Sequence, residues 1–173
     1  MSRHGSRTLN ASVLGLNALY LVSQTLIARR LGPVAHDALR LQTTMSADKF
    51  RGILDSWDDT GLAHYRSHLP PDMVHPLIYA ASLTASAMKL EELHRLPPAL
   101  RRMLLVAPWV SAACDYGENV AHLYLLDHRN KITPAMIRTT GTITNTKWAL
   151  AGACVITLLV GYAQVGWERA LGR

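Results

Sequence analysis

Long apolar runs alternate with polar connectors along this chain, and two of the runs contain no charged residue. They cover residues 8–28 and 148–167, and each can cross about 30 Å of hydrocarbon at 1.5 Å per residue of helix. The second run has Trp at both ends and places Ala153, Thr157 and Gly161 four residues apart, a spacing of small side chains suited to close helix contact. We predict a membrane-spanning helix over each run.

Two further runs contain polar residues but are long enough to form spanning helices. They cover residues 73–90 and 103–126, and each follows a Leu-Pro-Pro tripeptide, which begins at Leu69 or Leu96. Proline suits the first turn of a helix because its missing N–H would have no partner there, so we interpret both tripeptides as helix starts. The predicted fold class is therefore all-α: an integral membrane four-helix bundle, formed as a single domain by residues 1–173.

The connector between the first two predicted spans contains an amphipathic, extramembrane segment at residues 45–69. Ser46 is a suitable N-cap for a helix in this segment. Apolar side chains follow it at the i, i+3, i+4 and i+7 spacing of one helical face: Phe50, Ile53, Leu54 and Trp57. This amphipathic connector helix either lies on the membrane surface or caps the end of the bundle.

The third predicted span carries four polar residues on a single helical face. Asp115, Glu118, Asn119 and His122 lie at spacings i, i+3, i+4 and i+7. A charged carboxyl near the middle of a bilayer costs about 2.5 to 3.5 kcal/mol on insertion scales. The two acids must therefore find partners inside the bundle or serve a function, and the roles of structural seam and functional site stay open.

Polar residues in the other predicted helices can supply those partners. In the first span they recur every seven residues, which keeps them on one seam, and a lysine at the mouth of the last span is the nearest cation by topology. The possible partners of the cluster are Asn17, Gln24, Asp72, Tyr79 and Lys147.

The histidines do not form a recognisable metal motif. Glu118 and His122 are four residues apart, whereas helical di-iron sites use Glu-x-x-His pairs on two helices. His64 and His68 have a zinc-like spacing but no Glu between them, so we interpret them as exposed side chains of an extramembrane helix. We expect no metal and no cofactor, although a haem between His75 and His122 is geometrically possible if their helices run antiparallel.

The composition indicates which kinds of partner the protein binds and in which membranes it lies. The net charge of +6 suits anionic lipid headgroups, and without an aromatic-plus-basic motif we expect no nucleic acid. Cys114 and Cys154 fall in predicted spans and are interpreted as free thiols. The first acidic residue is Asp37, after Arg29 and Arg30, and an acid-free start is also typical of mitochondrial targeting. The bacterial inner membrane and the mitochondrial inner membrane both stay open.

Short motifs give the chain a resemblance to a known group of proteins. They are Asp72-x-x-His75-Pro76-x-x-Tyr79, Asp115-x-x-Glu118-Asn119 and Lys147-Trp148. In this order the motifs resemble a group of small, uncharacterised four-helix membrane proteins of bacteria. The resemblance implies the four-span layout and draws attention to Asp72, Asp115, Glu118 and Asn119, and it implies no particular activity.

No nucleophile motif, P-loop, dinucleotide-binding motif or haem-attachment Cys pair is present. The small size and the seams suited to helix contact favour a non-catalytic accessory or assembly subunit of a larger membrane complex, with the bilayer and other membrane subunits as partners. The alternative is a membrane-embedded lipid-modifying enzyme, or a protein that transfers protons or ions, centred on Asp115 and Glu118.

Overall fold

The computed structural model describes residues 3–172, and these residues form helices and no strand, which confirms the all-α fold class. Two short 3-10 helices join or follow longer α-helices. The elements in chain order are α1 (Arg3–Leu31), η1 (Gly32–Val34), α2 (Ala35–Thr43), α3 (Ala47–Asp55), α4 (Asp59–Asp72), α5 (His75–Leu93), α6 (Pro98–Asp127), η2 (Arg129–Lys131) and α7 (Pro134–Ala170).

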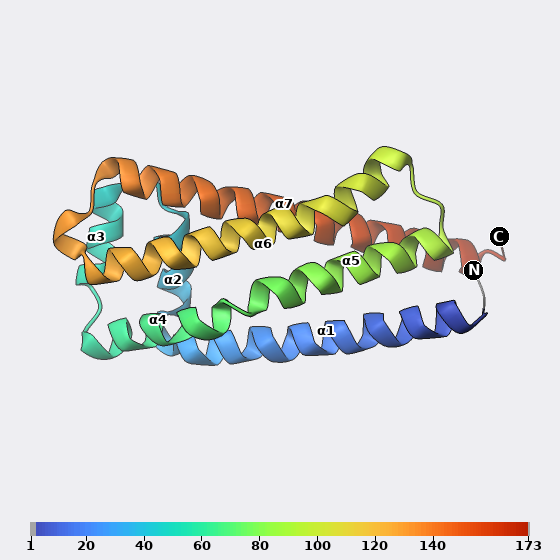
Figure 1. Ribbon diagram of the computed structural model, residues 1–173, viewed down its shortest axis with the longest axis horizontal. Helices are drawn as coiled ribbons and strands as arrows, with labels where there is room; N and C mark the ends of the chain where they lie inside the picture. Colours follow the sequence, from blue (N-terminus) through green and yellow to red (C-terminus); the bar gives the residue numbers. More distant parts are fainter. Residues whose placement is uncertain (1–2, 173) are drawn as a thin grey trace.

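The long helices lie side by side along one axis (Figure 1). α4 and α5 follow one another as the two halves of a single rod, and both pack along α1. α6 packs against α5 and α7, and the chain ends at the same end of the molecule as it begins (Figure 1). The short helices α2 and α3 lie at the opposite end, which we call the head.

The head is built on the apolar face of α3. Ser46 caps this helix, because its side chain accepts a hydrogen bond from the backbone N–H of Lys49 at 3.4 Å. Phe50 and Leu54 are buried against residues of α2, α4, α6 and α7. Burying each of these side chains contributes about 1.5 to 3 kcal/mol. Of the two placements that the sequence left open, the structure shows the connector helix capping the end of the bundle.

Close contact between α7 and the α2–α3 connection depends on one glycine. A Cβ atom at Gly141 would lie 2.5 Å from the carbonyl oxygen of Thr44, a distance that requires the backbone to move. Asn145, one turn further along α7, donates its side-chain amide to the carbonyl of Thr43 at 3.1 Å. The start of α7 is thus fixed against the head by backbone contacts as well as by apolar packing.

The rod formed by α4 and α5 begins and breaks at other residues than predicted. The sequence favours a helix start at Pro70 and Pro71, but α4 runs through both prolines to Asp72, and α5 begins at His75. Two successive prolines remove two backbone donors from the last turn of α4, and Pro76 removes a third just beyond the break. The prolines therefore mark an interruption within a rod, whereas α6 does begin at its Pro-Pro pair.

Two segments of the described chain are long and apolar enough to cross a membrane, Thr8–Thr43 and Pro134–Ala170. They contain the first and last predicted spans, and large apolar side chains on them are exposed, such as Leu14 at 73% and Leu159 at 65%. α5 and α6 do not meet the same criterion of length and composition. The four-span bundle predicted from the sequence therefore stays a prediction.

Candidate functional site

A lysine and two carboxylates form a buried ion-paired group between α6 and α7. Lys147 Nζ lies 3.2 Å from Asp115 Oδ1 and 2.6 Å from Glu118 Oε2. The two acids are one turn apart on α6, so a single ammonium group reaches both. The three side chains are nearly inaccessible to solvent, and the second oxygen of Glu118 has no hydrogen-bond partner.

Asp72 joins this group from the end of α4. Asn119 donates its side-chain amide to the backbone carbonyl of Asp72 at 3.0 Å, and so satisfies one acceptor that the break in the rod leaves without a helical partner. Among the described residues, no cation lies within ion-pair distance of the Asp72 carboxyl. Burial, together with the neighbouring Asp115, raises the pKa of Asp72 to about 7. We call Asp72, Asp115, Glu118 and Lys147 the charged cluster.

Neutral polar side chains hold the cluster from the α5 side. The hydroxyl groups of Tyr79 and Ser111 are 3.0 Å apart, and Ser111 also donates to the backbone carbonyl of Lys147 at 3.0 Å. His75 at the start of α5 hydrogen-bonds Ser23 of α1 through Nδ1 at 2.9 Å. These bonds fix the starts of α5 and of the apolar half of α7 at the same height in the bundle.

A second polar group lies between the cluster and the head. The Tyr65 hydroxyl hydrogen-bonds His122 Nδ1, and His68 Nδ1 hydrogen-bonds the Tyr65 carbonyl. A carbonyl only accepts, so His68 carries its proton on Nδ1, and its buried Nε2 is left as an acceptor with no partner. Burial lowers the pKa of His68 to about 4, so this ring is neutral at pH 7.

The placement of His68 corrects the sequence interpretation of two exposed histidines. His68 is only 1% exposed, because its ring packs against the ring of Tyr65 on a helix that contacts both α1 and α6. His64, one turn earlier, is half-buried, and its Nδ1 hydrogen-bonds the carbonyl of Arg30 at 2.9 Å. The spacing of His68 and Asp72, four residues apart on one face of α4, was the signal in the sequence that both belong to the site.

The polar seam of the first span has other partners than the cluster. Asn17 accepts a hydrogen bond from Ser82 at 3.1 Å and donates to Ser86 at 3.3 Å, both on α5. Gln24 is exposed and borders the same cavity as Asp72 and Tyr79. The structure thus brings Asp72, Tyr79 and Lys147 to the acids and uses the α1 seam to join α1 to α5.

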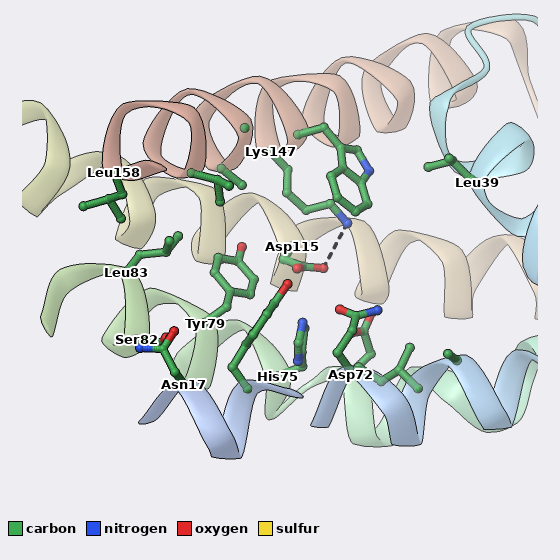
Figure 2. Close-up of a pocket in the computed structure, with 18 of the residues that line it drawn as sticks. Asn17, Leu39, Asp72, His75, Tyr79, Ser82, Leu83, Asp115, Lys147 and Leu158 are labelled. Carbon is green, nitrogen blue, oxygen red and sulfur yellow. Dashed lines mark hydrogen bonds and ion pairs between the residues drawn. The ribbon is translucent and has the colours of Figure 1, made fainter. Parts of the chain in front are cut away.

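Three members of the charged cluster, Asp72, Asp115 and Lys147, border a cavity of about 790 Å³ between α1, α5 and α7. Figure 2 shows Lys147 reaching towards Asp115, with Tyr79, His75 and Asp72 on the other side of the cavity. Most of the remaining lining is apolar on both sides of these groups. Away from the head it includes Val13, Leu83, Val155, Leu158 and Leu159, and towards the head it includes Ile27, Leu31, Ala38 and Leu39. α1 packs on α4 and α5 but not closely on α7 among the described residues, so the walls formed by α1 and α7 face each other across the cavity.

The cavity is long and has its ionisable groups in its middle part, because its lining also extends past them to Leu31 on α1 and to Leu39 and Gln42 on α2. On α7 its lining extends from Lys147 to Tyr162, which is about 22 Å at 1.5 Å per helical residue. The lining on α7 includes Gly152, where an added Cβ would meet no atom within 4 Å. A mostly apolar space lined by a few converging polar groups is the usual form of a small-molecule site.

The geometry of the described residues supports neither a metal site nor a haem site. Among the described residues, no group of three or more His, Cys, Asp or Glu side chains is arranged to hold a metal ion. His75 and His122, the two possible haem ligands, hydrogen-bond Ser23 and Tyr65 respectively. The ionisable groups of the site instead make ion pairs and hydrogen bonds with one another and with neighbouring side chains.

Comparison with known proteins gave no match: no protein-family model, no curated protein and no solved structure is significantly similar to this chain. The resemblance to small four-helix membrane proteins of bacteria therefore stays a prediction, and the site is interpreted from its geometry.

Proposed function

We propose that this chain is an integral membrane enzyme that binds a lipid-like molecule in its cavity and modifies the polar end of that molecule, with the charged cluster supplying general acid–base catalysis. Its first and last long helices supply exposed apolar faces, and Trp148 and Trp167 flank the apolar part of α7 as interfacial side chains do. α5 and α6 complete the bundle between these two helices.

The position of the charged cluster in such a membrane supports this function. Lys147 directly precedes the charge-free stretch that begins at Trp148, and Asp72 precedes α5. The cluster would then lie near one surface of the bilayer, at the depth of lipid headgroups, rather than at its centre. The head would lie outside the membrane on the same side, where its charged residues meet water.

The observation that carries the proposal is that Asp72, Asp115 and Lys147 all border the same cavity, and that most of the remaining lining is apolar. A satisfied structural seam would leave no space beside its charged groups. Closely spaced carboxyls and an ammonium group in a cleft are the arrangement that tunes side chains to give and take protons.

The first test compares the lipids of cells that lack the protein after they are supplied with the wild type or with a variant. Asp115→Asn removes a charge at the cavity wall and keeps the shape of the side chain, whereas Asp127→Asn is a matched change on the same helix at an exposed position. We expect the wild type and Asp127→Asn to change the amount of one lipid class at least tenfold, and Asp115→Asn to leave it as in the cells without protein. Equal protein levels are checked by immunoblotting.

The result against the proposal is the one that an accessory subunit predicts. In that case purification in mild detergent yields a stoichiometric membrane complex, and Asp115→Asn leaves every lipid class unchanged while the complex still forms. A lipid change that depends on Asp115 without any such complex supports the proposed function.

A further inference from the structure

The charged cluster has more carboxyls than cations, and this imbalance points to the charge of the ligand. It contains Asp72, Asp115 and Glu118 but only Lys147, whose ammonium already contacts two of the three acids. The remaining carboxyl, that of Asp72, borders the cavity with no cation in ion-pair distance among the described residues. A phosphate headgroup would meet these carboxyls at close range, which costs free energy, whereas an ammonium group would be attracted.

A second observation, independent of the acids, asks for a hydrogen-bond donor at the same place. His68 Nε2 is buried, has no partner and carries a lone pair, because the proton of the ring is on Nδ1. His68 also borders the cavity, one helical turn before Asp72 on α4. An ammonium group has three N–H donors and can satisfy both acceptors, a hydroxyl has one, and a fully ionised phosphate monoester has none.

The shape of the cavity indicates the length and the character of the apolar part of the ligand. On the side of the charged groups away from the head the lining is mainly apolar along about 22 Å of α7, longer than one half of a hydrocarbon core of about 30 Å. α1 and α7 form facing walls without packing closely on each other, which leaves a lateral way in from the bilayer.

Resting on the proposed function, we propose that the ligand is a single-chain lipid with a primary amine, which enters between α1 and α7. Its ammonium group donates to the Asp72 carboxyl and to His68 Nε2. Its chain lies along Leu83, Val155 and Leu158, which line the apolar part of the cavity.

The test measures binding of three probes that share one chain and differ in their headgroup: dodecylamine, dodecanol and dodecyl phosphate. The full chain in nanodiscs of zwitterionic phospholipid is titrated, and the fluorescence of Trp148, which borders the cavity, reports binding. We expect dodecylamine to bind about tenfold or more tightly than the other two probes, the value of one or two charge-assisted hydrogen bonds. Asp72→Asn should remove most of this preference, and Asp127→Asn should leave it intact.

A pair of glycine variants tests the lateral route. Gly152 and Gly166 both lie on α7, and an added Cβ at either meets no atom within 4 Å, but only Gly152 borders the cavity. Gly152→Phe should weaken binding of dodecylamine at least tenfold by filling the cavity, and Gly166→Phe should not change it. If Asp72→Asn does not fold, His68→Leu takes its place, with the same expected loss of amine preference.

The outcomes separate this inference from the proposed function. Dodecyl phosphate or dodecanol binding as tightly as dodecylamine, with Gly152→Phe still blocking all three, overturns the amine ligand and leaves a lipid site in place. An unchanged preference for dodecylamine in Asp72→Asn or His68→Leu also overturns it. No binding of any probe to the folded wild type contradicts the proposed function itself.

Discussion

Two ion-paired regions of this molecule join helices in opposite surroundings. Lys147 joins α7 to α6 through Asp115 and Glu118, and the three side chains are 7%, 5% and 0% exposed. Arg66 joins α4 to α6 through Asp127 at 2.5 Å, and these two side chains are 53% and 50% exposed. The distances in the two regions are similar, so the geometry of the pairs does not distinguish them.

The two regions differ in how far water reaches their charged groups. Exposed ion pairs gain little, because water already stabilises each charge and salt screens their attraction. Buried charges have lost their hydration on folding. If one partner of the pair is removed, the remaining charge lies in an apolar interior where no water can stabilise it. The Lys147 region should therefore be sensitive to every change of charge, whereas the Arg66 region should tolerate them.

The largest effect is expected from Lys147→Met, which keeps the length of the side chain and removes its charge. Two buried carboxyls then lose their cation, and breaking such a pair costs about 3 to 5 kcal/mol. Thermal unfolding in detergent micelles, followed by circular dichroism, should show a clear fall in Tm. Lys131→Met, at an exposed position of η2, is the control and should unfold like the wild type.

An unchanged Tm for Lys147→Met would mean that the acids of the cluster do not need the ammonium group, and the contrast between the two regions would then collapse. A fall of similar size in Lys131→Met would show instead that the assay responds to net charge rather than to burial.

A smaller effect is expected from pH, through Asp72. The pKa of Asp72 is about 7 in the folded protein and 3.8 without the surrounding structure, as in an unfolded chain. The folded state therefore holds the proton more tightly. The stability that this provides is complete below pH 3.8 and is lost as pH rises to about 7. The Tm of the wild type should therefore fall between pH 5 and pH 8, and Asp72→Asn should remove much of this fall.

The exposed region supplies the matched control for the pH experiment. The hydrogen bond from Arg66 lowers the pKa of Asp127, so its contribution is present above the ordinary pKa of an aspartate and is lost only as pH falls below it. Asp127→Asn should leave the pH dependence between pH 5 and pH 8 as in the wild type. A wild-type Tm that does not change over this range would contradict the assignment of Asp72.

Periodicity predicted the helices better than it predicted their breaks. The charge-free runs of α1 and α7, the cap at Ser46 and the apolar face of Phe50 and Leu54 all follow from local sequence. The continuation of α4 through Pro70 and Pro71 does not, because packing against α1 and the bond from Asn119 stabilise a helix end that proline alone disfavours. Tertiary contacts decided where the rod is interrupted.

The candidate site was predictable where it depends on spacing within one helix. Asp115, Glu118 and Asn119 share a face of α6 in the sequence as in the structure. That Asn17 would bond Ser82 and Ser86 instead of the acids depends on the relative height of α1 and α5, which a single sequence does not contain. The cavity was unpredictable for the same reason, since it exists where α1 and α7 fail to meet.

The smallest effect is expected from Arg66→Ala, which removes the exposed pair. Both partners are hydrated, so we expect no measurable change in Tm at physiological salt. The residual attraction should be visible only at low ionic strength, where the Debye length grows to about 30 Å at 0.01 M. Tm is therefore measured for the wild type and Arg66→Ala in 10 mM and 500 mM salt.

The outcome of this last comparison decides what the Arg66 pair does in the fold. If Arg66→Ala lowers Tm as far as Lys147→Met does, in high salt as well as in low salt, the pair is not a screened surface contact. The packing of α4 against α6 then depends on this pair. If the difference from the wild type disappears in high salt, the junction of α4 and α6 depends on the buried contacts of Asn119 and Tyr65 instead.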